Sequence, residues 1–290
     1  MQGRADGPRN SFRSIAILMI IPVGGLIIFF LWNWLHGGRP SIETSRTPPV
    51  AARTTTTTQA SVIAPSPKPR ETHHRDIVLI IDDLGFDGQP LDGVMALDPN
   101  VNCSILPNGT RATEFAKRLH ARGFEILCHL PMEPIGHEWP GRDAILTSMS
   151  SDEIARVTKE NVEAVPFARG MNNHMGSRAT TDRRVMTSVL GALPRGMYFI
   201  DSRTTGGSIA ATVAREMNVQ TATRNVFLDD DASEPAVRKQ FAELVAAAEK
   251  HGEAIGIGHP HPVTMRVLSE EMPKLRARGF RFVRASEVVR

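Results

Sequence analysis

The first strong pattern along the chain is one unbroken apolar segment near its start. Residues 15–35 carry no charged side chain and are numerous enough to cross a bilayer as a helix. The segment ends in bulky residues that include Trp32 and Trp34, rather than in the small residues of a signal-peptide cleavage site. We therefore expect a retained transmembrane helix, and a cleaved signal peptide is the alternative interpretation.

Arginines on the N-terminal side of this segment predict its orientation. Arg4, Arg9 and Arg13 precede it, and positively charged flanks favour the cytoplasmic side of a membrane. We therefore expect residues 1–14 in the cytoplasm, the helix in the inner membrane, and the bulk of the chain in the periplasm.

The next segment, residues 36–74, shows no apolar periodicity. It is rich in Pro, Thr, Ser and Ala, and Thr54 to Thr58 form an unbroken row. Such a composition buries too little apolar surface to offset the chain entropy that folding removes. We interpret it as a disordered, flexible linker between the membrane helix and a folded domain at residues 75–290.

From residue 75 onward, short apolar runs alternate with longer segments of helical periodicity. The helical segments include 114–122, one that begins at the capping pair Ser150 and Glu153, and 234–251. This alternation is typical of βα units around a parallel sheet. We predict an α/β fold, a distorted (β/α) barrel with about seven or eight parallel strands. The predicted strands are residues 77–81, 101–106, 124–130, a short one near 171, 197–200, 219–222, 254–257 and 280–283.

Charge is distributed unevenly between the two parts of the chain. Residues 1–75 hold nine Lys or Arg and three Asp or Glu, whereas the remainder holds 25 and 28. The folded domain is thus slightly acidic, which argues against a nucleic-acid partner. The two cysteines, Cys103 and Cys128, lack Cys-x-x-Cys spacing, and the sequence leaves open whether they form a disulfide.

Ionisable and amide side chains follow several predicted strands at their carboxyl ends. Asp82 and Asp83 come directly after the run 77–81. Taken alone, this pair is also compatible with an ordinary turn before Gly85. Because the carboxyl ends of barrel strands converge on one rim, the repetition favours a common site. The other groups are His129 and Glu133, then Asn172, Asn173, His174 and Ser177, then Asp201 and Arg203, and finally His259 and His261.

Taken together, these motifs resemble the polysaccharide deacetylase superfamily of carbohydrate esterases, and most closely its divergent branch. The resemblance covers residues 76–290 and implies a metal-dependent hydrolase that deacetylates an N-acetylated glycan, such as a peptidoglycan-type polysaccharide of the cell envelope. The segments that carry it are I-D-D-L-G at 81–85, G-F-E-I at 123–126, H-L-P-M-E-P at 129–134, N-N-H-M-G-S at 172–177 and G-H-P-H-P at 258–262.

The resemblance implies a divalent metal ion, zinc above all, and ligands for it. Asp83 and His129 match the metal-binding acid and the first metal-binding histidine of the family. The second histidine of the family falls on Glu133, which is a departure from the pattern. His174 is available to supply the missing imidazole, so Glu133 and His174 both stand as candidate ligands.

The resemblance also implies an acid and a base. Asp82 matches the general base, and His259 matches the histidine that protonates the leaving group, with His261 as a possible second member. The arginine that orients the base in the family has no counterpart here, and Arg178 and Arg203 are candidates. We expect the substrate to meet Asn172, Asn173, Ser177, Asp201 and Arg203.

Two other functions are compatible with the sequence. One is a glycan-binding or envelope-scaffold module that kept the barrel and lost efficient hydrolysis, which Glu133 and the missing arginine motivate. The other is a metal-dependent hydrolase of a different bond, since a metal, a base and an acid are general tools. Trp139 is a candidate for stacking on a sugar, and packing against a loop is its alternative explanation.

Overall fold

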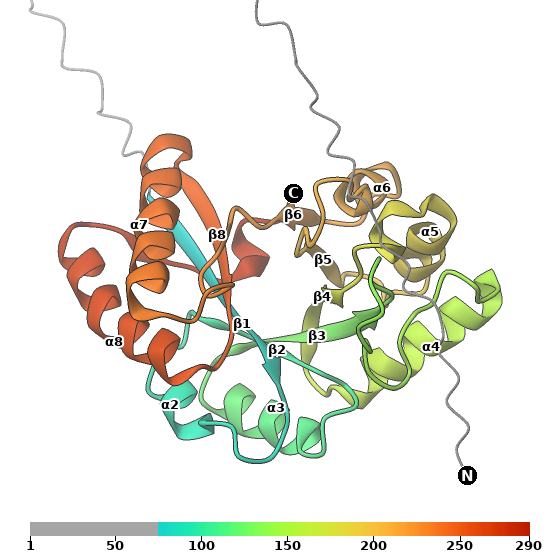
Figure 1. Cartoon of the computed structure of the whole chain (residues 1–290), viewed down its shortest axis with the longest axis horizontal. Helices are drawn as coiled ribbons and strands as arrows, with labels where there is room; N and C mark the ends of the chain where they lie inside the picture. The colour runs from blue at the N-terminus through green and yellow to red at the C-terminus, as the bar shows by residue number, and fades with distance from the viewer. Residues whose placement is uncertain (1–74) are drawn as a thin grey trace, which may run out of the picture. The chain divides into compact units, whose positions relative to one another are not determined.

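The predicted sheet is present and is parallel throughout (Figure 1). The computed structural model describes residues 75–290, in which the strand order is β6, β5, β4, β3, β2, β1, β8, β7, with β9 paired to β1. All the predicted strands are confirmed, and β7 is an additional one. The strands are β1 (Asp76–Leu84), β2 (Asn102–Ile105), β3 (Glu125–Met132), β4 (Ala168–Met175), β5 (Tyr198–Asp201), β6 (Thr221–Thr223), β7 (Val226–Phe227), β8 (Glu253–Gly258) and β9 (Arg281–Phe282).

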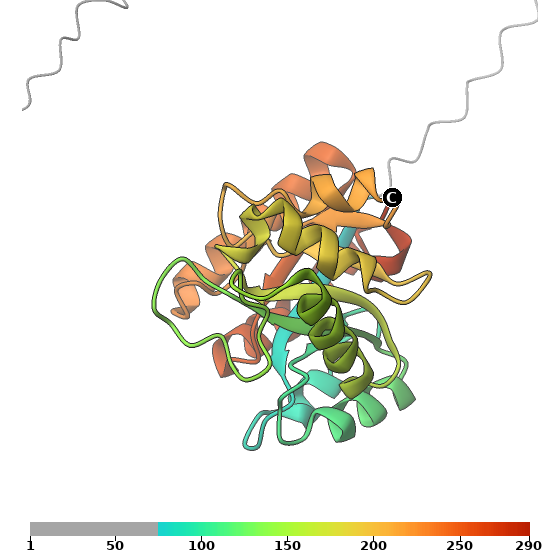
Figure 2. The same ribbon diagram turned by 90° about the vertical axis from the view of Figure 1, so that its right-hand side faces the viewer.

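Helices cover the outer face of the curled sheet (Figure 1, Figure 2). The predicted capping pair is confirmed, because the Ser150 hydroxyl accepts a hydrogen bond from the Glu153 amide at 3.2 Å. The helix predicted at 234–251 has those bounds and ends at Gly252, whose φ of 84° is the left-handed conformation of a C-terminal cap. The helices are α2 (Leu91–Met95), α3 (Ala112–Ala121), α4 (Ser151–Ala164), α5 (Arg183–Gly191), α6 (Ala210–Glu216), α7 (Glu234–His251) and α8 (Pro262–Ala277), with short 3₁₀ turns η1 (Ala179–Thr181) and η2 (Ala285–Glu287).

Both faces of the central strands are buried, which explains why they read as continuous apolar runs. In β1, Ile77, Leu79 and Ile81 pack in the layer between sheet and helices. Val78 and Ile80 point to the opposite side, into a smaller apolar cluster enclosed by the curl of the sheet. Cys103 and Cys128 are both buried in the outer layer as free thiols.

The predicted barrel is open at one seam. The two edge strands, β6 and β7, are consecutive in the chain, and each pairs with a different neighbour. Thr223 pairs with Asp201 of β5, whereas Phe227 pairs with Ile257 of β8. Within residues 75–290 no ladder joins β6 to β7, because this short segment crosses from one edge to the other.

The amino ends of the strands are closed by the C-terminal segment of the chain. The Tyr198 hydroxyl donates to Glu125 Oε1 at 2.8 Å, and the Ser286 hydroxyl donates to Glu125 Oε2 at 2.6 Å. The Ala285 amide donates to Asn102 Oδ1 at 2.9 Å. This end of the sheet is therefore filled, and the carboxyl end remains for chemistry.

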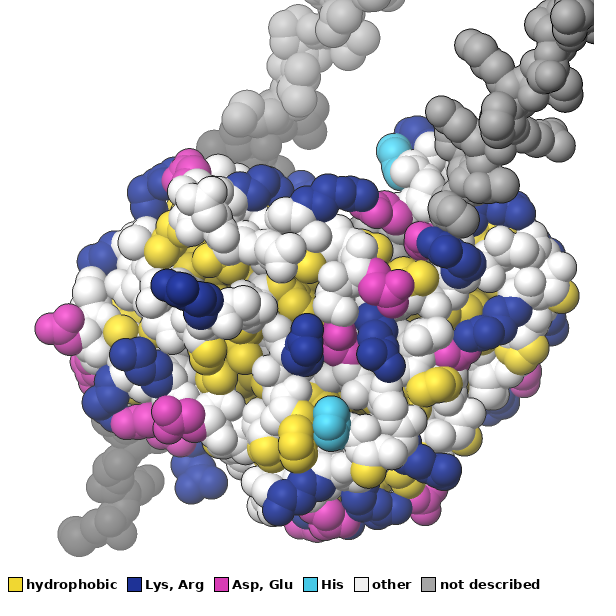
Figure 3. Space-filling view, turned by 180° about the vertical axis from the view of Figure 1, so that it is seen from behind, with side chains coloured by type: hydrophobic (Ala, Val, Ile, Leu, Met, Phe, Trp, Pro, Cys, Tyr) yellow, Lys and Arg dark blue, Asp and Glu magenta, His cyan; other side chains and the backbone are white. Residues whose placement is uncertain are grey.

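Charged side chains of both signs are interspersed over the surface shown in Figure 3. Many form ion pairs, such as Arg281 with Asp76 at 2.7 Å. Within residues 75–290, no helix has the length and apolar character needed to span a membrane. The predicted N-terminal segment, membrane helix and linker, residues 1–74, lie outside the described residues.

Candidate metal centre and active site

The two aspartates of β1 both reach the carboxyl rim, although they are adjacent in the strand. Regular alternation would send neighbouring side chains to opposite faces. The register of β1 with β2 shifts between Ile81 and Leu84, and Asp83 has a φ of 58°. This local irregularity turns Asp83 toward the histidines of β3 and β4, while Asp82 stays in the interior.

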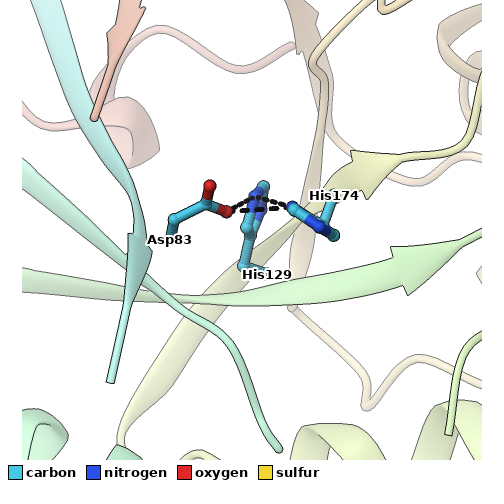
Figure 4. A group of neighbouring side chains, drawn as sticks. All are labelled: Asp83, His129 and His174. Carbon is cyan, nitrogen blue, oxygen red and sulfur yellow. Dashed lines mark hydrogen bonds and ion pairs between the residues drawn. The ribbon is translucent and has the colours of Figure 1, made fainter. Parts of the chain in front are cut away.

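Asp83, His129 and His174 form a tight group (Figure 4). Asp83 Oδ1 lies 3.2 Å from His129 Nε2 and 2.9 Å from His174 Nδ1. The same two ring nitrogens are 3.2 Å apart. These three atoms, supplied by the ends of β1, β3 and β4, surround a common point.

The donor set fits a divalent cation. Although Asp83 Oδ1 is buried and close to two ring nitrogens, it has no hydrogen-bond partner among the described residues. A buried carboxylate oxygen without a hydrogen-bond partner destabilises the fold, and a bound cation would remove this unfavourable free energy. One carboxylate and two imidazoles are also ligands that zinc uses in proteins.

The charges around the group favour positive charge at its centre. Burial by itself raises the pKa of Asp83, but His129 and His174 outweigh it and hold that pKa well below its usual range. Burial likewise lowers the pKa of His129, but Asp82 and Asp83 outweigh it and raise that pKa. A proton and a metal ion thus compete for the same place.

Asp82 is a buried carboxylate next to the group. It is only 2% exposed, and its Oδ2 lies 3.5 Å from His129 Nε2. The amide nitrogen of Asn172 donates to its two oxygens at 2.9 and 3.0 Å. Burial raises the pKa of Asp82, and the neighbouring charge of Asp83 adds to this effect. A carboxylate with a raised pKa is a better proton acceptor.

His259, at the end of β8, faces the same group from the other side. Its Nε2 lies 3.8 Å from Asp83 Oδ2, and its Nδ1 lies 2.9 Å from Asp229 Oδ1. Burial by itself lowers the pKa of His259, but Asp229 and Asp82 outweigh it and raise that pKa to about 9. The ring is therefore a proton donor at neutral pH.

Asp229 is the main residue that the sequence analysis missed. Besides His259 Nδ1, it accepts the His259 backbone N–H and the Thr264 hydroxyl, each at 2.7 Å. It comes one residue after β7, at the end of the apolar run 226–228, as Asp82 and Asp83 follow an apolar run in β1, so the same rule would have found it. No strand is predicted at this position, where β7 has only two residues.

Two predicted residues lie apart from the metal group. Glu133 Oε2 accepts the Thr147 hydroxyl at 2.6 Å, and its Oε1 lies 3.3 Å from Arg178 Nε. The structure therefore brings His174, and not Glu133, to Asp83 and His129. His261 is exposed, with its ring centroid 5.8 Å from that of His259.

Most residues expected to meet the substrate are bound within the protein. Asn172 and Asn173 are fully buried, and Asn173 bridges the Met175 carbonyl and the Ser202 amide. Asp201 accepts the Arg203 amide and the Ser208 hydroxyl, each at 2.8 Å.

The remaining two positions differ in exposure. The Ser177 hydroxyl accepts the Ile135 amide at 2.8 Å and so holds the loop that follows β3. The Arg203 side chain is the exposed member of the set. Neither Arg203 nor Arg178 forms an ion pair with Asp82 within residues 75–290.

The chain combines a curled parallel α/β sheet with an Asp–His–His group on its carboxyl rim, and it is of the polysaccharide deacetylase-like class. The chain belongs to the divergent polysaccharide deacetylase family, whose model matches residues 79–289. This match confirms the resemblance seen in the motifs.

Individual relatives share the domain. The chain is 39% identical over 195 residues to the uncharacterized protein YibQ of Escherichia coli, covering 67% of this chain and 61% of that protein. It is 34% identical over 200 residues to an uncharacterized protein of Haemophilus influenzae, covering 69% and 71%. A crystal structure of an uncharacterized protein from Agrobacterium tumefaciens C58 has the same fold, with a TM-score of 0.71 at 21% identity over 74% of this chain and 89% of that one.

Proposed function

We propose that the domain is a metal-dependent deacetylase that hydrolyses the acetamide groups of an N-acetylated cell-envelope glycan. The observation that carries this proposal is the convergence of Asp83 Oδ1, His129 Nε2 and His174 Nδ1 around one point. Among residues 75–290, Asp83 Oδ1 has no hydrogen-bond partner. Membership of the divergent polysaccharide deacetylase family supports the amide bond as the target.

The residues around this point have three different roles in the reaction: metal binding, proton acceptance and proton donation. A zinc ion held by Asp83, His129 and His174 would supply Lewis acidity toward the acetamide carbonyl. Asp82 takes a proton from the attacking water, and His259 gives one to the departing amine nitrogen. One water is consumed, the C–N bond breaks, and the products are acetate and a free amino sugar.

We further propose that residues 15–35 anchor the protein in the inner membrane and that the domain acts in the periplasm. The uncharged apolar segment and the arginines before it support this location. A polysaccharide of the cell envelope would then be on the same side of the membrane as the domain.

Metal content tests the ligand set. We expect the purified full-length protein to hold about one divalent ion per chain, bound by Asp83, His129 and His174. His174→Ala, Asp83→Ala and His129→Ala should each weaken binding by more than about 100-fold, since even outer-shell partners contribute about 10- to 100-fold. Elemental analysis and competition with a chelator measure both quantities.

Glu133→Gln is the matched control, because Glu133 is the competing candidate and its carboxylate bonds elsewhere. It should keep its metal. Loss of metal in Glu133→Gln with retention in His174→Ala would overturn the ligand set.

Acetate release tests the reaction itself. The metal-loaded protein should release acetate from N-acetylglucosamine oligomers, and Asp82→Asn should lower kcat by about 100-fold or more while metal stays bound. Metal binding and glycan binding without acetate release would favour the glycan-binding module instead. Release of phosphate or of amines from phosphoesters or peptides would point to a hydrolase of another bond.

A further inference from the structure

Asn172 lies at the centre of the candidate site, although it is closed to any substrate. It belongs to β4, is fully buried, and pairs in register with His129 of β3. Its side chain lies between the proposed base, Asp82, and the proposed metal ligand, His129. A buried amide that is hydrogen-bonded to two functional groups can fix the orientation of both.

Every hydrogen-bonding position of the Asn172 amide is in use. Its nitrogen donates to both Asp82 oxygens and to the Ser202 hydroxyl, at 2.9, 3.0 and 3.1 Å. Its oxygen accepts the Ser104 hydroxyl at 2.6 Å and lies 2.9 Å from His129 Nδ1. An amide offers two donors and one oxygen with two lone pairs, so no capacity is left for a ligand.

This arrangement fixes which way the amide points. A flipped amide would place its oxygen against the Asp82 carboxylate, where two acceptors would repel each other. With its nitrogen on Asp82, its oxygen must face His129, and His129 Nδ1 must therefore carry the proton. The lone pair of His129 Nε2 is then directed to the point shared with Asp83 and His174.

The same amide is the neutral support of Asp82. Within residues 75–290, Asp82 forms no ion pair with Lys or Arg, and its one such contact is His129. Asn172 holds both carboxylate oxygens without adding a charge. Asp82 is thereby oriented while it keeps the basicity that a bound guanidinium would remove.

We propose that Asn172 is a positioning residue that couples the base to the metal site, holding Asp82 in place and selecting the tautomer of His129 that can bind metal. This proposal rests on the proposed deacetylase function. It explains why, within residues 75–290, no arginine forms an ion pair with Asp82: an amide orients this carboxylate instead.

Two substitutions separate the two halves of this role. In Asn172→Asp, one oxygen still accepts from His129 and Ser104, but the other lies against Asp82, where the two buried carboxylates share one proton and Asp82 is no longer a free base. Asn172→Ala removes the hydrogen bonds to Asp82 and to His129 together. We expect Asn172→Asp to keep wild-type Co²⁺ affinity and to lose kcat by about 100-fold with little change in KM. Asn172→Ala should lose kcat and also weaken Co²⁺ binding by about 10- to 100-fold.

Chelator competition and the visible spectrum of the Co²⁺-loaded full-length protein test the effect of Asn172 on the metal site. The values of kcat and KM for N-acetylglucosamine oligomers test its effect on Asp82. Asn161→Asp is the matched control, because Asn161 is a buried residue of α4 whose side-chain amide, within residues 75–290, bonds only to the Asp143 and Val157 carbonyls. It should lower thermal stability without changing the Co²⁺ spectrum or affinity.

The results that would overturn the proposal are distinct from failure of the deacetylase function. Equal loss of Co²⁺ in both Asn172 variants, in step with their loss of stability, would reduce Asn172 to a packing role. Wild-type kcat in Asn172→Asp would remove its role toward Asp82. If wild type releases no acetate, the deacetylase proposal fails, and the difference in Co²⁺ affinity still decides whether Asn172 sets the His129 tautomer.

Discussion

At the scale of single residues, the site depends on side chains that hold other side chains. Asn172 fixes His129 and Asp82, and Asp229 fixes His259 through its ring and its backbone. Each of these supports is buried and hydrogen-bonded to a reacting group, so a small change in one alters the charge or direction of that group. The candidate site therefore includes residues that no substrate reaches.

Removing the charge of Asp229 should change the pH dependence of the reaction. A proton donor with a raised pKa is active below that pKa, so kcat should fall as pH rises through about 9. Asp229→Asn removes a carboxylate that raises the pKa of His259 and should move this alkaline limb to lower pH. The pH profile of kcat measures the shift.

Thr264→Val is the control for this effect, because the Thr264 hydroxyl donates to Asp229 without carrying charge. Its alkaline limb should move much less. An unmoved limb in Asp229→Asn would show that His259 is not the proton donor.

At the scale of elements, the loop between β3 and α4 differs from the other connections of the rim. It stands out from the body as a green segment in Figure 2. Its start is held firmly, since the Ile135 amide donates to Ser177 and the Ile135 carbonyl accepts from Arg178. Trp139 nevertheless remains 73% exposed and Ile135 59% exposed. Exposed apolar side chains on a held loop are suited to a sugar ring.

Trp139→Ala should weaken glycan binding. Stacking of an aromatic ring contributes about 1 kcal/mol, so KM for N-acetylglucosamine oligomers should rise about 5-fold while kcat changes little. Phe167→Ala is the control, because Phe167 is also exposed but precedes β4, at the opposite end of the sheet. An equal change in both variants, or none in Trp139→Ala, would exclude this loop from substrate binding.

At the scale of the whole molecule, stability and chemistry lie at opposite ends of the sheet. The carboxyl end holds the ionisable groups, and the amino end is filled by Glu125, Tyr198 and Ser286. Burial raises the pKa of Tyr198, and Glu125 adds to this rise, so the hydroxyl stays protonated and keeps donating. This division is common in barrels, where the amino-end residues serve stability.

Glu125→Ala should therefore lower the free energy of unfolding and leave kcat per folded molecule unchanged. It leaves the buried Tyr198 hydroxyl and Ser286 without an acceptor, which costs about 1–3 kcal/mol for each unsatisfied group. Tyr198→Phe removes one hydrogen bond and should cost only about 1 kcal/mol. Urea unfolding measures both, and a kcat per folded molecule below wild type in Glu125→Ala would contradict the separation of the two ends.

The sequence by itself determined eight of the nine strands and the helices α3, α4 and α7, because apolar periodicity and capping residues act locally. The strands and the helix 234–251 follow from such patterns, and so does the expectation that Asp82, Asp83, His129 and His259 share one rim. Rules about strand ends are enough for this, since a parallel sheet carries all its carboxyl ends to the same side.

Only the tertiary structure decided which side chains meet. His174 joins Asp83 because β4 lies beside β3, whereas Glu133 turns to Thr147 and Arg178. Asn172 looks like a loop amide in the sequence and becomes a buried support in the fold, and Asp229 reaches His259 because β7 pairs with β8. These outcomes depend on hydrogen bonds between segments far apart in the chain, and local sequence patterns do not carry that information.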